Sequence, residues 1–146
     1  MKKVSLLIPV LAAGLLSACG KGPNEAAEYR ESVFKATAWH FGTLGAMAKG
    51  EQPFDQAVFE EKAGIVADLS RLPWEGFTDA GSADGSHAKP AIWENRADFE
   101  GKAQDFQDAA AELAEMAGSA EQQALFAQVG KVGETCRACH TEYRER

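Results

Sequence analysis

Two cysteines and a histidine stand close together near the carboxyl end of the sequence, in the segment Cys136-Arg137-Ala138-Cys139-His140. In this C-x-x-C-H spacing, two thiols can add to the vinyl groups of one haem while the adjacent imidazole reaches its iron. We therefore predict one covalently attached haem c. Cys136 and Cys139 would form the thioether bonds, and His140 would be the axial ligand of the iron.

Three other interpretations of this motif remain open. A redox-active dithiol usually follows a strand in a βαβ unit, and the sequence has no such pattern. A structural zinc site would need ligands beyond this cluster, and only His40 and His87 remain as histidines outside it. The third interpretation is a buried structural pair of cysteines. The spacing favours haem attachment over all three.

The segments that must position this motif are helical, because apolar residues recur at steps of three and four. Gly118 can end one helix, and Ser119 with Gln122 forms a capping box that can begin the next, which predicts a tight hairpin. Two stripes flank that hairpin: Phe99, Ala103, Phe106, Ala110, Leu113 and Ala117, then Leu125, Val129, Val132, Cys136, Cys139 and Tyr143.

Two further helices precede this hairpin. The first spans about residues 25–49, and the second about residues 55–72, where Pro73 ends it. The first stripe consists of Ala27, Arg30, Phe34, Ala38, Phe41, Gly45 and Ala48, and the second of Val58, Ile65, Leu69 and Leu72. A connection of residues 73–89 follows, long enough to act as a functional cover, and Pro90 opens the third helix.

Four amphipathic helices with two short links and one long link predict an all-α fold, an antiparallel four-helix bundle with the haem on its C-terminal helix. Residues 25–146 would form this single domain. This length is enough for one domain with a hydrophobic core and too short for two domains.

The first residues are typical of an export signal, and we do not expect them to form part of the fold. Lys2 and Lys3 precede an apolar run that is too short to span a membrane and is interrupted by Pro9. The segment Leu16-Ser17-Ala18-Cys19 is typical of a bacterial lipobox. We expect a lipoprotein signal peptide over residues 1–18 and a lipidated tether over residues 19–24, with lipid on Cys19.

Charge limits the partners. Without Lys2 and Lys3, 13 basic residues face 22 acidic ones, which gives a mature net charge near −9. Nucleic acid is therefore an improbable partner, and membrane attachment must come from the lipid on Cys19. Gly20, rather than an aspartate, follows that cysteine. We accordingly expect the domain on the periplasmic side of a bacterial membrane, most simply the outer one.

Beyond C-x-x-C-H, weaker motifs occur in a specific order. Together they make the chain from about residue 29 to residue 146 resemble the cytochrome c-prime family, class II c-type cytochromes. The motifs are Tyr29-Arg30, His40-Phe41-Gly42, Leu72-Pro73-Trp74, Ile92-Trp93 and the haem motif followed by Tyr143-Arg144. The resemblance implies a five-coordinate haem that binds nitric oxide and carbon monoxide and resists dioxygen. Its low-spin relatives place a methionine on the iron, where this chain has Phe34.

The resemblance also implies roles for individual residues. Arg30 matches an arginine that meets a haem propionate, the alternative being a solvated helix charge. Arg144 matches an arginine on the proximal side, a role that can coexist with stabilising the helix end. Trp74 and Phe77 match distal-pocket residues, the alternative being plain core aromatics. Phe34 would crowd the distal side.

These inferences favour a gas-binding haem lipoprotein that captures nitric oxide in the periplasm and lowers its toxicity. An electron carrier with an unknown redox partner is the alternative, and it would gain from a sixth ligand that the sequence does not supply. An enzyme such as a peroxidase would need a distal acid or base. The family resemblance also allows a homodimer formed through the first two helices.

Overall fold

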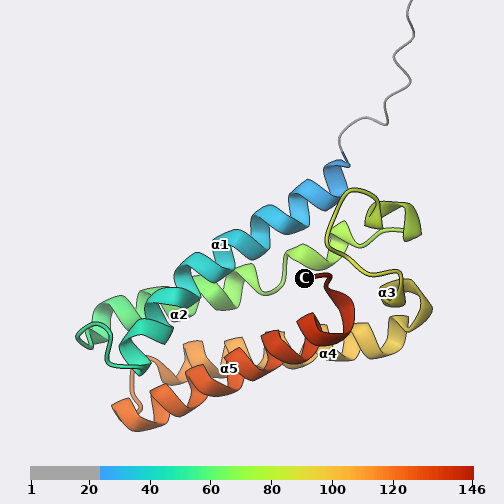
Figure 1. Ribbon diagram of the computed structural model, residues 1–146. Helices are drawn as coiled ribbons and strands as arrows, with labels where there is room; N and C mark the ends of the chain where they lie inside the picture. The colour runs from blue at the N-terminus through green and yellow to red at the C-terminus, as the bar shows by residue number, and fades with distance from the viewer. Residues whose placement is uncertain (1–23) are drawn as a thin grey trace, which may run out of the picture.

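Four long helices run alternately in opposite directions along one axis (Figure 1). The computed structural model describes residues 24–146. The signal peptide, Cys19 and nearly all of the tether lie outside the described residues. The helices are α1 (Glu25–Ala48), α2 (Gln56–Leu69), α4 (Arg96–Met116) and α5 (Gln122–Tyr143), with a short α3 (Ala91–Glu94) before α4. The described part contains no strand, and the predicted all-α four-helix bundle is confirmed.

The helices pack in a closed square, α1 against α2 and α5, and α4 against the same two. A large core cluster fills the end at which residues 49–55 and 117–121 turn the chain. A second, smaller cluster of Phe77, Ile92, Phe99 and Tyr143 lies at the other end. The amino end of α1, the connection between α2 and α4 and the carboxyl end of α5 meet at that second end (Figure 1). Within residues 24–146, no helix is both long enough and apolar enough to cross a membrane.

Side chains and one glycine set the helix ends. Asn24 accepts a hydrogen bond from the backbone N–H of Ala27, and Asp55 accepts one from Val58, so both act as N-caps. Gly50, with φ of 72°, terminates α1 in the left-handed conformation that glycine adopts without strain.

The predicted capping box at Ser119 is wrong. The N-cap of α5 is Glu121, and it makes no side-chain hydrogen bond to the helix. Ser119 donates its backbone N–H to the carbonyl of Met116, so it lies in the turn that follows α4 and does not begin the next helix. The hairpin itself is confirmed.

The predicted register and length of the second helix are also wrong. It ends at Leu69, and the next turn leads into a 3₁₀ helix, η1 (Pro73–Gly76). Its buried residues are Phe59, Ala63, Val66 and Ala67, whereas the residues expected to be buried are partly or, for Leu72, 44% exposed. Neighbouring apolar residues form two parallel stripes on this helix, and spacing alone does not show which one faces the core.

The third helix begins in two pieces. Pro90 is the N-cap of α3 rather than of the long helix, and Asn95, with φ of −122° and ψ of 48°, interrupts the helix before α4 starts. The long connection predicted over residues 73–89 contains η1 and a second 3₁₀ helix, η2 (Ala80–Ala83). These short elements hold the connection against α1.

Candidate functional site

A cavity of about 500 Å³ lies between α1, α4, α5 and the connection between α2 and α4. Cys136, Cys139 and His140 all line it. Because residues three and four apart share one face of a helix, α5 presents both thiols and the imidazole to the same space. The structure thus brings the three predicted haem-attachment residues together.

The electrostatics of these three groups argue against a redox dithiol and favour ligation by the imidazole. Burial raises the pKa of the Cys139 thiol to about 11 and also raises the pKa of Cys136, so neither cysteine has the stabilised thiolate of a redox-active dithiol. Burial, and then the charge of Arg144, lowers the pKa of His140. The imidazole is therefore favoured in its neutral form, which is the form that binds a metal.

Three aromatic residues form one wall of the cavity. The ring of Phe34 contacts those of Trp74 and Phe77 edge-on, with centroid distances of 5.8 and 6.4 Å. Trp74 and Phe77 stack at 6.2 Å, and Phe99 from α4 lies 4.9 Å from Phe77. The predicted distal residues therefore form a single apolar surface with Phe99, supplied by three segments far apart in the sequence.

Arg30 also lines the cavity, but it is not the solvated helix charge that was considered as an alternative. Its side chain is only 2% exposed, and it donates hydrogen bonds to the connection between α2 and α4. Burial lowers its pKa. The propionate contact stays a prediction.

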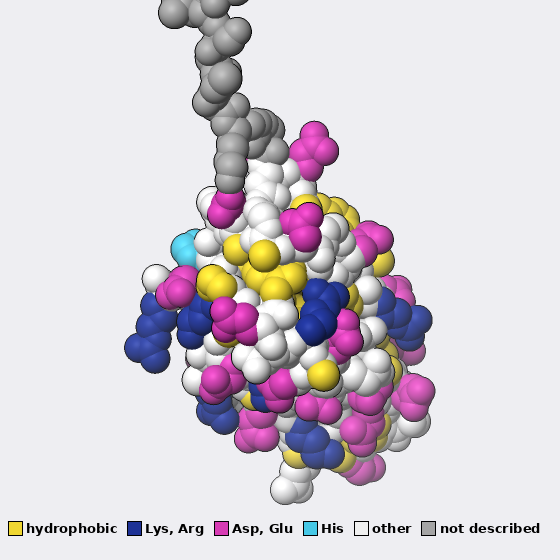
Figure 2. Space-filling view, turned by 90° about the vertical axis from the view of Figure 1, so that its right-hand side faces the viewer, with side chains coloured by type: hydrophobic (Ala, Val, Ile, Leu, Met, Phe, Trp, Pro, Cys, Tyr) yellow, Lys and Arg dark blue, Asp and Glu magenta, His cyan; other side chains and the backbone are white. Residues whose placement is uncertain are grey.

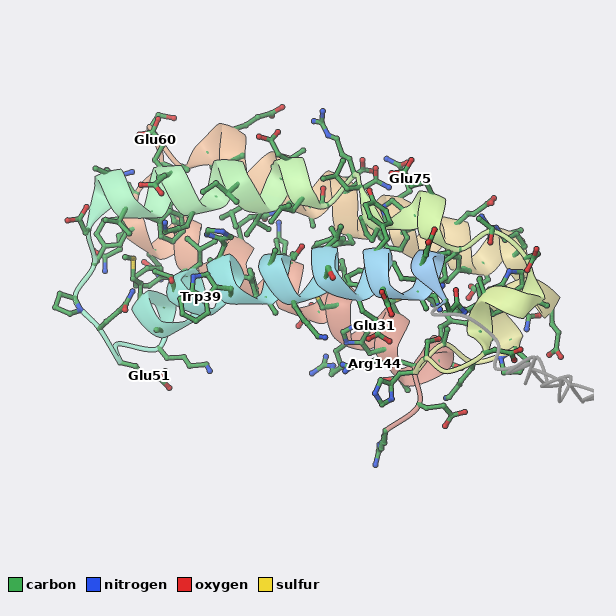
Figure 3. All side chains as sticks on the ribbon, turned by 90° about the horizontal axis from the view of Figure 1, so that it is seen from above. Glu31, Trp39, Glu51, Glu60, Glu75 and Arg144 are labelled. Atoms are coloured by element: carbon green, nitrogen blue, oxygen red, sulfur yellow. The ribbon has the colours of Figure 1, made fainter. Side chains whose placement is uncertain are left out.

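Arg144 lies at the carboxyl end of α5 and lines the cavity together with Glu31 of α1 (Figure 3). Its backbone forms an isolated bridge with Ala88. On either side of this bridge, the N–H of Lys89 donates to the carbonyl of Tyr143 at 3.0 Å, and the N–H of Glu145 donates to His87 at 2.7 Å. The segment around Ala88 is therefore fixed next to the last turn of α5.

The sequence did not single out several residues of the cavity. Lys102 lies three residues after Phe99 and four before Phe106, so helix spacing could have found it. Ser86 and His87 lie in the connection, where no periodicity exists to place them. Glu31 and Lys35 extend the α1 face beyond the apolar stripe.

The cavity residues fit a haem. Its volume lies within the range of about 300–1,000 Å³ typical of pockets that enclose small molecules, and aromatic side chains dominate its walls. Four basic side chains face one acidic side chain, although the whole protein is acidic, which suits a group with two carboxylates. They are Arg30, Lys35, Lys102 and Arg144, with Glu31 as the acid. Figure 2 looks onto this end of the bundle and shows hydrophobic side chains bordered by charged ones.

Two of the three rival interpretations of the motif, the zinc site and the redox dithiol, lose support. Residues 24–146 contain no cluster of three or more histidine, cysteine, aspartate or glutamate side chains that could hold a metal ion, as a zinc site would require. The same residues form no βαβ unit, the usual setting of a redox dithiol.

Comparison with known proteins points in the same direction. The family model described as Cytochrome C' matches residues 25–144. Cytochrome c' from Rubrivivax gelatinosus is 39% identical over 127 residues, which cover 85% of this chain and 97% of the relative. The structure of cytochrome c prime from Shewanella frigidimarina superposes with a TM-score of 0.82 at 43% identity, covering 87% of this chain and 99% of that one.

Two structures of variants of cytochrome c prime from Alcaligenes xylosoxidans are also similar. One, a nitric oxide complex, has a TM-score of 0.79 at 37% identity and covers 85% of this chain and 96% of that one. The other, with bound carbon monoxide, has a TM-score of 0.78 at 36% identity and covers 87% of this chain and all of that one.

Proposed function

The chain belongs to the cytochrome c' family, which carries one covalently attached haem c, and from this premise we propose that it captures nitric oxide on the periplasmic side of a bacterial membrane. Cys136 and Cys139 would hold the haem, and His140 would ligate its iron. When bound, ferrous haem supplies an iron atom with an open axial position for a diatomic ligand. Solved relatives with nitric oxide and carbon monoxide bound support this function.

The aromatic wall is the observation that carries the proposal. Phe34, Trp74 and Phe77 present ring edges and faces to the cavity that also contains His140. Dioxygen is retained by a haem protein when a hydrogen-bond donor stabilises its polar bound form, whereas nitric oxide binds ferrous haem without one. An aromatic wall therefore favours nitric oxide over dioxygen.

Three polar hydrogens near this wall are already used within the protein. Trp74 donates its indole N–H to the carbonyl of Ser70 at 2.6 Å. Thr37 donates its hydroxyl to Val33 at 2.9 Å, and Ser86 donates its hydroxyl to Ala83 at 2.9 Å. Recruiting any of these donors for a ligand would cost an existing hydrogen bond.

Ligand selectivity of the purified haem protein tests this function. We expect nitric oxide and carbon monoxide each to change the optical spectrum of the reduced protein, and air-saturated buffer to leave no spectrum of a ligand complex before oxidation. The resting spectrum should be that of a five-coordinate haem. A six-coordinate resting spectrum, with no response to either gas, would instead support the electron carrier.

Membrane attachment through Cys19 is the second part of the proposal. The lipobox ending at this residue supports it, and Gly20 after it favours the outer membrane. In detergent phase separation, the wild-type protein should enter the detergent phase and Cys19→Ala should stay in the aqueous phase. Cys139→Ala, which changes a cysteine elsewhere, is the matched control and should partition like wild type. Aqueous partitioning of the wild type would contradict lipidation.

Pairing of two copies through α1 and α2 completes the proposal. Trp39 supports it, because this large side chain lies on the outer surface of α1 and is 78% exposed (Figure 3). Exposed aromatic side chains are enriched in interfaces between proteins. Sedimentation equilibrium of the wild type and of Trp39→Glu measures this pairing directly.

A further inference from the structure

The buried guanidinium of Arg30 ties α1 to the cover segment, by which we mean residues 76–89. One nitrogen, Nη1, donates to the carbonyl of Gly76 at 2.8 Å. The other, Nη2, donates to the carbonyl of Ser82 and to the hydroxyl of Ser86, both at 2.6 Å. A guanidinium has five N–H donors, so these three bonds leave two for other partners. Arg30 thus contacts the start, middle and end of the cover segment.

The same arginine and a second one fix Phe77. The Cζ atom of Arg30 lies 4.7 Å from the centroid of the Phe77 ring, and Phe99 contacts that ring at 4.9 Å. From α4, Arg96 donates to the carbonyl of Phe77 at 2.9 Å, and its Cζ lies 5.7 Å from the ring of Phe99. Phe77 is therefore held by its ring from α1 and by its backbone from α4.

Close packing of the backbone makes this arrangement specific. A Cβ atom on Gly76 would lie 2.8 Å from the carbonyl oxygen of Ala26 and 3.0 Å from the Cβ of Arg30. The cover segment thus begins in direct contact with α1. Asn24 adds hydrogen bonds to the carbonyls of Ser82 and Asp84, which hold its middle against the same helix.

We propose that Arg30 is a positioning residue that, together with Arg96, fixes Phe77 and the cover segment and so sets the shape of the aromatic wall. This role differs from the propionate contact predicted from the sequence, for which the two remaining N–H donors are still free to serve. The positioning role rests on the proposed function only in one respect, namely that the aromatic wall borders the bound gas. The fixing of the segment is a property of the chain itself.

Hydrogen exchange of the haem-loaded protein tests the proposal without any gas ligand. Arg30→Met keeps an unbranched side chain but removes the guanidinium and all of its donors. We expect backbone amides of the cover segment to exchange at least about tenfold faster in this variant, while those of α4 and α5 stay unchanged. Arg30→Lys keeps the charge but lacks the planar guanidinium that forms all three hydrogen bonds. Exchange of the cover segment in this variant should therefore lie between those of wild type and Arg30→Met.

Arg71→Met is the matched control, because the side chain of this exposed arginine makes no hydrogen bond or ion pair with the described residues, and exchange in this variant should equal that of wild type. Unchanged exchange of the cover segment in Arg30→Met would overturn the proposal. So would a uniform increase over all helices, which would indicate a merely stabilising role. If Arg30→Met does not fold, Arg30→Lys and Arg96→Met carry the same comparison.

The outcomes also separate this proposal from the proposed function. A local exchange increase in a protein that does not bind nitric oxide would uphold the positioning role and overturn the function. If the protein binds nitric oxide but the exchange of the cover segment is unchanged in Arg30→Met, the function is upheld and the positioning role is overturned. A change in the carbon monoxide association rate of Arg30→Met, together with the local exchange increase, would connect the two.

Discussion

Replacing Cys136 and Cys139 together with alanine should abolish covalent haem attachment completely. Both side chains line the cavity from one face of α5, and together they supply both thioether bonds. A chain without haem leaves an apolar cavity of about 500 Å³ without the group that fills it, and we expect the double variant to be unstable. Haem staining after denaturing gel electrophoresis, combined with the intact mass, measures the attachment.

The single variants refine this result. Cys136→Ala and Cys139→Ala should each retain one thioether, whereas His140→Ala should retain both and lose the axial ligand, which changes the spectrum rather than the mass. Cys19→Ala is the matched control, because it removes a cysteine outside the motif and should keep the haem. Covalent haem in the double variant would refute the assignment of the site.

Shortening Phe34 to alanine should raise the carbon monoxide affinity of the reduced protein by about tenfold. Phe34 is half-buried, lines the cavity and contacts Trp74 and Phe77, so its ring occupies space that a distal ligand would need. Relief of about 1.4 kcal/mol of crowding corresponds to that factor. Dioxygen should gain less, because the new space contains no hydrogen-bond donor. Flash photolysis and equilibrium titration give the rates and the affinity.

Two further variants decide whether position 34 matters. Phe34→Met places a thioether sulfur near the iron and should shift the spectrum toward six-coordinate low spin. Phe54→Ala is the matched control, because Phe54 is also half-buried among aromatic rings but packs on Phe59 and Phe126, outside the cavity. Unchanged carbon monoxide kinetics in Phe34→Ala, with an unchanged spin state in Phe34→Met, would make Phe34 only a core residue.

The sequence predicted the bundle and the shared helix face of the three motif residues, because both depend on local sequence. C-x-x-C-H is a contiguous motif, and its spacing alone places Cys136, Cys139 and His140 on one face of a helix. Four residues of the stripe predicted on α1 line the cavity rather than the deepest core: Arg30, Phe34, Ala38 and Phe41. The core positions of that helix, such as Leu44 and Met47, lie beside this stripe.

The predictions that were wrong concern features that local sequence does not determine. On α2, adjacent apolar residues such as Ile65 and Val66 lie on two different faces of the helix. Only packing against α1 and α4 determines which face is buried. The break at Asn95 has no strong sequence signal. The three hydrogen bonds of Arg30 join parts of the chain 46 to 56 residues apart, a distance over which local patterns carry no information.

Backbone pairing between residues 87–89 and residues 143–145 has a consequence for the order of assembly. Residues 143–145 follow Cys136 and His140 in the sequence, so synthesis delivers the C-x-x-C-H motif before the two segments of this pairing can meet. Contacts between distant segments also form late in folding, because closing the intervening loop costs entropy. The pairing that fixes Ala88 beside Arg144 at the cavity is thus completed after the cysteines themselves have emerged, which leaves an interval in which a bulky planar group can still be brought to them.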